Sequence, residues 1–229
     1  MELLRKLEEV SGGLVKLVSV APEVEGAMDF IREASGEVQV SIAHTTADYD
    51  TAMAAFAAGA SHVTHLFNAM PAFTHRAPGV VGAAFDTPDC RVELICDGIH
   101  IHPSVVRSVF KLFGADRVVL VSDTMRAAGM ADGDYSLGGQ PVIKKGKYAT
   151  LADGTLAGSV TDLMDCMRTA VSFGIPLADA VRAAAVNPAR AIGIYSRCGS
   201  LECGKWANVV LLNKDLSIRN VIFKGEVIA

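Results

Sequence analysis

The sequence predicts an α/β fold built on a parallel sheet, and three observations lead to that class. Short runs rich in β-branched residues recur at 14–20, 37–43, 61–66, 91–96 and 117–122. Each run is almost continuously apolar, as expected for parallel strands that are buried on both faces. Helical segments separate the runs at intervals of roughly 20–30 residues, which fits either a doubly wound sheet or a (β/α)8 barrel.

Proline and glycine mark the ends of the helices between these strands. Proline is favoured in the first turn of a helix and glycine just beyond its last turn. The predicted helices run from Pro22 to about residue 34, from Asp48 to Gly59 and from Pro103 to Gly114.

After residue 125 the pattern changes. Residues 132–159 are rich in Gly and Asp and predict an inserted hairpin. Two helical stretches follow at about 160–173 and 177–192, the second interrupted near Pro188. The tail predicts two or three antiparallel strands of a separate β-layer. We therefore expect two domains, an α/β domain over 1–196 and part of a small β-domain over 197–229.

Composition narrows the class of protein. The net charge is -4, and no basic stripe is interleaved with aromatics, so we expect no nucleic-acid partner. No run reaches the ~18 apolar residues that a membrane span requires, and the N-terminus lacks the apolar centre of a signal peptide. Five irregularly spaced cysteines without a CxxC pair indicate reduced thiols. These features predict a cytoplasmic protein that has no membrane partner.

Polar residues follow four consecutive strands. The strands lead into His44, His65, Asp97 or His100, and Asp123. In a parallel barrel the strand ends lie on the face that carries chemistry. A single histidine after a strand is usually a capping or edge residue. Four strands in succession that end in His or Asp favour a shared functional site.

The residue types suit a metal centre. Two imidazoles bind Zn²⁺ or Fe²⁺ well, and a carboxylate can complete a three-ligand site with an open position. Such a metal lowers the pKa of bound water to about 7. Asp123 could then take a proton from the water and pass it to a leaving group. The alternative is that Asp123 caps the following helix.

Several segments resemble one family. The run from 44 to 84, HTTADYDTAMAAFAAGASHVTHLFNAMPAFTHRAPGVVGAA, is similar to N-acetylglucosamine-6-phosphate deacetylases of the amidohydrolase superfamily. DGIHIHP, LVSDTMRAAG, LADGTLAGS, NPARAIGI and GSLECGKWANVVLL continue the match in order. The resemblance implies a (β/α)8 TIM-barrel metallohydrolase, here with about five C-terminal strands, followed by strands of a small β-sandwich.

The resemblance also implies roles for residues. His44 and His65 match metal ligands, with Zn or Fe as the most expected metal, and Asp123 matches the general base and acid. The matching substrate-binding positions are Asn68, Ala69, Arg76, His100, Leu156, Ala157 and Gly158. Arg76 would serve the neighbouring subunit of a homodimer. The implied reaction hydrolyses N-acetylglucosamine 6-phosphate, a phosphorylated amino sugar, to glucosamine 6-phosphate and acetate.

Two family residues have no match in this chain. In the family, a Glu ligand and a His that polarises the acetyl carbonyl follow earlier barrel strands. None of the N-terminal glutamates, Glu23, Glu25, Glu33 and Glu37, stands in the required motif. Two alternatives to the deacetylase therefore stay open: another amidohydrolase that acts on a cyclic amide, and a truncated, inactive remnant or subunit.

The remaining polar residues near these motifs have simpler expected roles. His62 precedes His65 by three residues, so it points to the opposite face of its strand and we expect it to be structural. His102 should begin a helix, and His75 lies in the loop with Arg76. Asp97 either orients His100 or shapes a turn.

Overall fold

The computed structural model describes residues 1–229, and its centre is a parallel sheet of five strands. These are β1 (Leu17–Val20), β2 (Gln39–Ile42), β3 (His62–Val63), β4 (Arg91–Ile95) and β5 (Val118–Val121). All four pairings are parallel, and the strands lie in chain order. A doubly wound sheet reverses its strand order, whereas a barrel does not. The order therefore favours a sector of a barrel, and all five predicted strands are confirmed.

The predicted helices lie between these strands, and two further helices that were not predicted are present, one before β1 and one between β3 and β4. The helices are α1 (Glu2–Ser11), α2 (Ala27–Ala34), α3 (Tyr49–Ala57), α4 (Gly79–Asp86) and α5 (Pro103–Phe113). Asp48 caps α3 by accepting a hydrogen bond from the Thr51 N–H at 2.8 Å. His102 caps α5, with Pro103 in its first turn, as predicted. The unpredicted helices are α1, which buries only Leu4, and α4.

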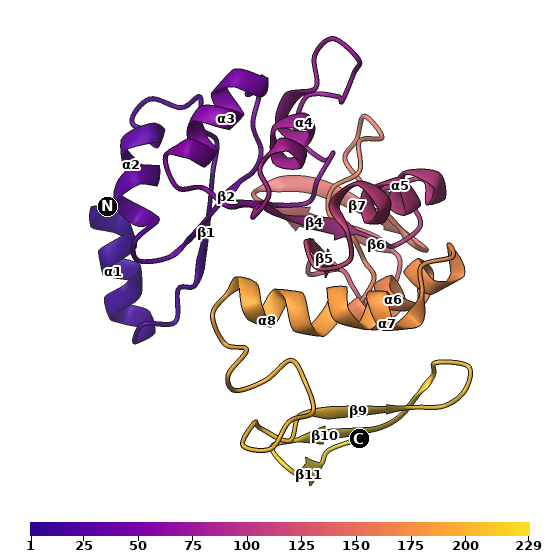
Figure 1. Cartoon of the computed structure of the whole chain (residues 1–229). Coiled ribbons are helices and arrows are strands. Elements are labelled where there is room, and N and C mark those ends of the chain that lie inside the picture. The colour runs from indigo at the N-terminus through magenta and orange to yellow at the C-terminus, as the bar shows by residue number, and fades with distance from the viewer.

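The two faces of the sheet differ in chemistry. Val40, Val63, Val92 and Val118 are fully buried against the helices α2–α5, which lie on one side of the sheet in Figure 1. The opposite face carries a polar row of Ser19, Ser41, Thr64, His62 and Glu93. This face would point into a closed barrel, and hydrogen bonds join its residues from one strand to another.

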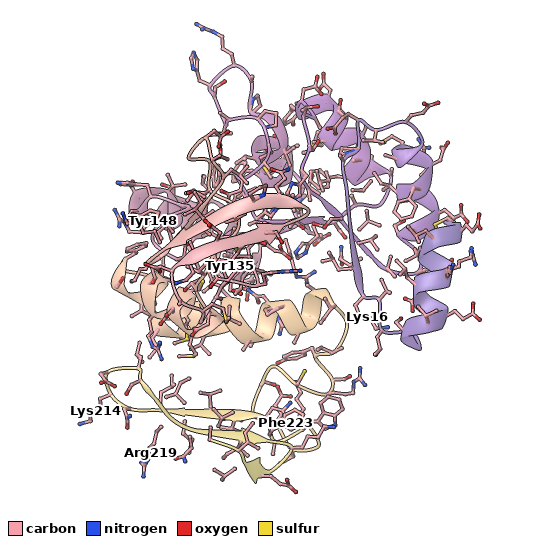
Figure 2. The ribbon with its side chains drawn as sticks, turned by 180° about the vertical axis from the view of Figure 1, so that it is seen from behind. Lys16, Tyr135, Tyr148, Lys214, Arg219 and Phe223 are labelled. Atoms are coloured by element: carbon pink, nitrogen blue, oxygen red, sulfur yellow. The ribbon has the colours of Figure 1, made fainter.

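The segment after β5 forms a small sheet of its own. Its strands are β6 (Gly133–Leu137), β7 (Gln140–Lys145) and β8 (Tyr148–Thr150), all antiparallel. The predicted hairpin is therefore extended by a third strand. A separate small core of Met125, Ala127, Val142, Ala149 and Ala157 stabilises it. Tyr135 and Tyr148 mark this sheet in Figure 2.

The C-terminal third contains helices followed by an antiparallel sheet. Helix α6 (Leu163–Ser172) precedes α7 (Leu177–Val181), the π-helical turn η1 (Arg182–Val186) and α8 (Asn187–Ala191). The π-turn lies just before Pro188, so the predicted interruption is present. The last strands, β9 (Val209–Leu212), β10 (Ile218–Phe223) and β11 (Glu226–Val227), form one antiparallel sheet beyond these helices. A second layer of a sandwich is not seen. Phe223 and Lys214 mark this sheet in Figure 2.

Two features concern the whole chain. No helix combines the length and the apolar character needed to cross a membrane.

All five cysteines are free, as predicted. Burial raises the pKa of Cys90, Cys96 and Cys166 to about 12, so these three are inert as thiolates.

Candidate functional site

The two predicted metal ligands meet at the carboxyl edge of the sheet. His44 follows β2 and His65 follows β3, and these strands are neighbours. Their Nε2 atoms lie 3.0 Å apart, and the two rings are nearly perpendicular, at 86°. His65 is buried, whereas His44 is exposed to solvent. The pair therefore presents two converging ring nitrogens at an accessible edge.

The backbone at these positions is in an unusual conformation. His44, His65 and Asp123 have φ angles of 46°, 34° and 48°. This left-handed region is uncommon for residues other than glycine, and holding a residue there costs about 1–3 kcal/mol. The three predicted reactive residues share this strain, and it persists only where the surroundings hold the backbone.

Asp123 is held by the segment that contains the predicted substrate loop. The Ser159 N–H donates to the Asp123 carbonyl at 2.9 Å, and the Met125 N–H donates to the Ser159 carbonyl at 2.9 Å. A Cβ on Gly158 would lie 3.4 Å from the Asp123 carbonyl oxygen. The structure thus brings the predicted loop residues Leu156, Ala157 and Gly158 alongside Asp123.

The carboxyl group of Asp123 is affected by three of the predicted histidines and by Glu93. Loss of solvent around the carboxyl raises its pKa above the ordinary value. The positive charges that His65, His100 and His44 can carry lower the pKa, whereas the charge of Glu93 raises it. These four residues therefore lie close enough to Asp123 to interact electrostatically. A raised pKa makes the carboxylate a stronger base than an ordinary aspartate.

His100 is held by Asp97. Its Nδ1 lies 2.7 Å from Asp97 Oδ2, and Asp97 Oδ1 accepts hydrogen bonds from the N–H groups of Ile99 and His100, both at 2.9 Å. Only 4% of the Asp97 side chain and 6% of the His100 side chain are exposed. Asp97 therefore performs both of its alternative roles, because it shapes the turn and orients His100.

The remaining predicted substrate residues follow His65. The Asn68 amide donates to the carbonyls of His65 and Leu66, at 3.2 and 3.3 Å. The Ala69 carbonyl accepts a hydrogen bond from the Thr45 N–H at 3.0 Å. His44 and Ala69 share a cavity of about 430 Å³, lined also by Thr45, Thr46, Met70 and Pro71.

Arg76 is not brought to that cavity. It lies in an exposed segment that precedes α4 and projects from the molecule in Figure 1. His75, which precedes it, is exposed as well.

Two carboxylates near the site were not predicted to belong to it. Glu23, beyond the end of β1, accepts hydrogen bonds from Thr45 and Thr46, directly after His44. Glu93 bonds His62 at 3.1 Å, and His62 is fully buried, as expected of a structural residue. Glu23 follows a predicted strand, so the strand-end pattern that indicated His44 could have indicated it too.

The spacing and the number of candidate ligands indicate how many positions of a metal site this chain can supply. Two imidazole nitrogens bound to tetrahedral zinc lie about 3.3 Å apart, close to the His44–His65 separation. No group of three or more His, Cys, Asp or Glu side chains in the chain could hold a metal ion. His44 and His65 thus fit two ligand positions, and this chain does not form a complete ligand set.

A family model of the amidohydrolase family matches residues 18–228. The chain belongs to the amidohydrolase family. N-acetylglucosamine-6-phosphate deacetylase of Bacillus subtilis (strain 168) is 39% identical over 99% of the chain. N-acetylgalactosamine-6-phosphate deacetylase of Escherichia coli O157:H7 is 37% identical over 98%.

Solved structures agree with this assignment. The structure of a variant N-acetyl-D-glucosamine-6-phosphate deacetylase from Mycobacterium smegmatis, in complex with N-acetyl-D-glucosamine-6-phosphate, matches 98% of this amidohydrolase chain. Its TM-score is 0.93 at 36% identity. The chain spans 58% and 62% of the two curated relatives and 60% of that structure.

Proposed function

We propose that this chain carries the acid–base group and two metal ligands of a site that hydrolyses N-acetylglucosamine 6-phosphate to glucosamine 6-phosphate and acetate. The observation that carries the proposal is the meeting of His44 and His65 at one sheet edge, within electrostatic reach of Asp123. The deacetylases that resemble the chain over nearly all its length support the choice of reaction.

His44 and His65 would hold a divalent metal, with Zn²⁺ or Fe²⁺ favoured by the imidazole donors. When bound, such a metal lowers the pKa of water to about 7 and polarises a carbonyl. Asp123 takes the proton of the attacking water, since its raised pKa suits a base. It then delivers that proton to the amide nitrogen as the carbon–nitrogen bond breaks, which releases the amine.

The other predicted residues would bind the sugar phosphate. Backbone N–H groups near Asn68 and Ala69 and a guanidinium fork suit a phosphate dianion. His100, fixed by Asp97, would contact the sugar. The segment from Leu156 to Gly158 would cover the substrate beside Asp123.

Arg76 supports a homodimer in this proposal. It is exposed and has no hydrogen-bond partner within its own chain, so its guanidinium is free to reach a substrate in the neighbouring subunit. The five free cysteines suit the reducing cytoplasm. We also propose the division into domains at 1–196 and 197–229, which the separate C-terminal sheet supports.

A cyclic amide is a less favoured substrate, because the similar curated proteins are named for deacetylation of amino-sugar phosphates. One of them is named for the galacto epimer, so both epimers belong in the test.

The test is acetate release from each epimer, with dihydroorotate as the cyclic-amide comparison. It uses the 229-residue chain and a chimera in which the preceding portion of the B. subtilis relative is joined to it. We expect the chimera to release acetate and its Asp123→Asn variant to release none. A chimera that unfolds cooperatively and binds metal, yet hydrolyses neither epimer, would refute the proposal.

A further inference from the structure

Glu23 makes an unusual set of contacts beside the metal-ligand pair. It lies three residues beyond the end of β1, whose neighbour in the sheet is β2. Its Oε2 accepts a hydrogen bond from the Thr45 hydroxyl. Its Oε1 accepts from the Thr46 N–H and from the Thr46 hydroxyl, the latter at 3.1 Å. One carboxylate thus bonds both residues that follow His44.

His44 needs such support. Its backbone is left-handed, with φ of 46°, and its side chain packs edge-on against the His65 ring but is exposed to solvent. The residue that follows it provides further support. Thr45 is buried, its N–H donates to the Ala69 carbonyl at 3.0 Å, and its hydroxyl oxygen accepts from the Ala47 N–H at 2.9 Å. Glu23 completes this set from the segment that follows β1.

The charge of Glu23 strengthens the contacts. Loss of solvent around its carboxyl raises its pKa, but the hydrogen bonds from Thr45 and Thr46 outweigh that effect and hold the pKa below the ordinary value. The group is therefore a carboxylate at neutral pH, and hydrogen bonds to an ionised acceptor are about twice as strong as neutral ones.

We propose that Glu23 is a positioning residue that fixes His44 through Thr45 and Thr46. Both of its oxygens are engaged by the two threonines, and it forms no group of three candidate metal ligands with the histidines. The inference rests on the proposed metal role of His44. Residues that orient metal ligands contribute strongly to metal affinity, and their loss typically weakens it about 10- to 100-fold.

The experiment compares Glu23→Ala and Glu23→Gln with the matched control Glu25→Ala in the 229-residue chain. Glu25 is exposed and makes no side-chain hydrogen bond. The readouts are amide hydrogen exchange at residues 45–47 and the Zn²⁺ dissociation constant. We expect Glu23→Ala to speed exchange at Thr46 and to weaken Zn²⁺ binding about tenfold, whereas the control changes neither. Glu23→Gln should lie between them, because its amide oxygen still accepts from Thr46.

Each result decides the inference. Faster exchange confined to residues 44–47 supports it. Unchanged exchange and Zn²⁺ affinity in Glu23→Ala overturn it, as does faster exchange throughout the chain, which would indicate a general structural role. Loss of Zn²⁺ binding as complete as in His44→Ala also overturns it, since Glu23 would then be a ligand. If His44→Ala leaves Zn²⁺ binding unchanged, the proposed metal role fails, and exchange alone decides whether Glu23 holds this segment.

Discussion

Removal of the Asp97 carboxylate should destabilise the fold and release His100. The side chain is 4% exposed and accepts hydrogen bonds from two backbone N–H groups and the His100 ring. Breaking a buried pair by removing one partner costs about 3–5 kcal/mol, because the other group loses its partner without regaining water. Ile99 and His100 are only half-buried as residues, so water can partly satisfy their N–H groups. We therefore expect Asp97→Ala to lower the free energy of unfolding by about 3 kcal/mol.

Asp97 should make the free energy of unfolding decrease as the pH is lowered. Burial raises the pKa of Asp97, but hydrogen bonds from His100 and Ile99 outweigh it and hold the pKa below its ordinary value. The unfolded chain therefore binds more protons than the folded chain in this range. The stabilisation is fully present above the unfolded pKa of about 4 and is lost as the pH falls through the lower folded pKa. Asp97→Asn should remove this part of the pH dependence.

Urea unfolding at pH 7, 5 and 3.5 measures both effects. Asp134→Asn is the matched control, because Asp134 is exposed and makes no side-chain hydrogen bond. The wild-type chain and the control should lose more stability between pH 5 and 3.5 than Asp97→Asn does. A loss below about 1 kcal/mol in Asp97→Ala would contradict the interpretation of Asp97 as a buried anchor, as would equal pH slopes in all three proteins.

Three further predictions test the candidate site. Asp123→Asn in a complete enzyme should abolish acetate release and leave metal content unchanged, and activity that persists would exclude Asp123 as the base. The purified 229-residue chain should bind Zn²⁺ weakly through His44 and His65 and release no acetate, since it lacks a third ligand. Normal turnover by that chain would contradict this expectation. Gly158→Ala should cost about 1 kcal/mol or more in urea unfolding, because φ is +73° and the new Cβ would lie 3.4 Å from the Asp123 carbonyl. An unchanged unfolding midpoint would show that the turn tolerates a side chain.

The strands were predictable because burial on both faces gives each one a continuous apolar run. The residues at which the strands begin and end were less predictable. The run at 61–66 contains a strand of two residues, since the backbone becomes left-handed at His65. The helices α1 and α4 were missed for opposite reasons. Helix α1 does carry apolar residues at helical spacing, namely Leu3, Leu4, Leu7 and Val10, but only Leu4 is buried. Helix α4 is apolar almost throughout and contains two glycines, so it shows no clear amphipathic period.

The grouping of the candidate site residues was predictable from their positions in the sequence. In parallel strands, the residues just after each strand share one edge, so His44, His65 and Asp123 could be grouped without coordinates. The hydrogen bonds that support them were not predictable, although the position of Glu23 shortly after a strand was. Glu23 meets Thr45 only because β1 and β2 are neighbours, and the segments that follow them fold toward each other. Such contacts depend on loop conformation, for which the sequence carries no periodic signal.

Hydrogen bonds from other residues of the chain support the segments around His44, His65 and Asp123. Glu23 holds the segment after His44, the Asn68 amide binds the His65 carbonyl, and Ser159 binds the Asp123 carbonyl. These contacts come from the chain itself and hold the segments that carry the two ring nitrogens, which lie 3.0 Å apart. Ligands that the protein holds in place reduce the free energy that metal binding spends on ordering them. The fold therefore keeps a strained backbone at the strand ends, and these strained positions carry the candidate metal ligands. Relieving the strain by His44→Gly should stabilise the backbone turn and should remove one ligand.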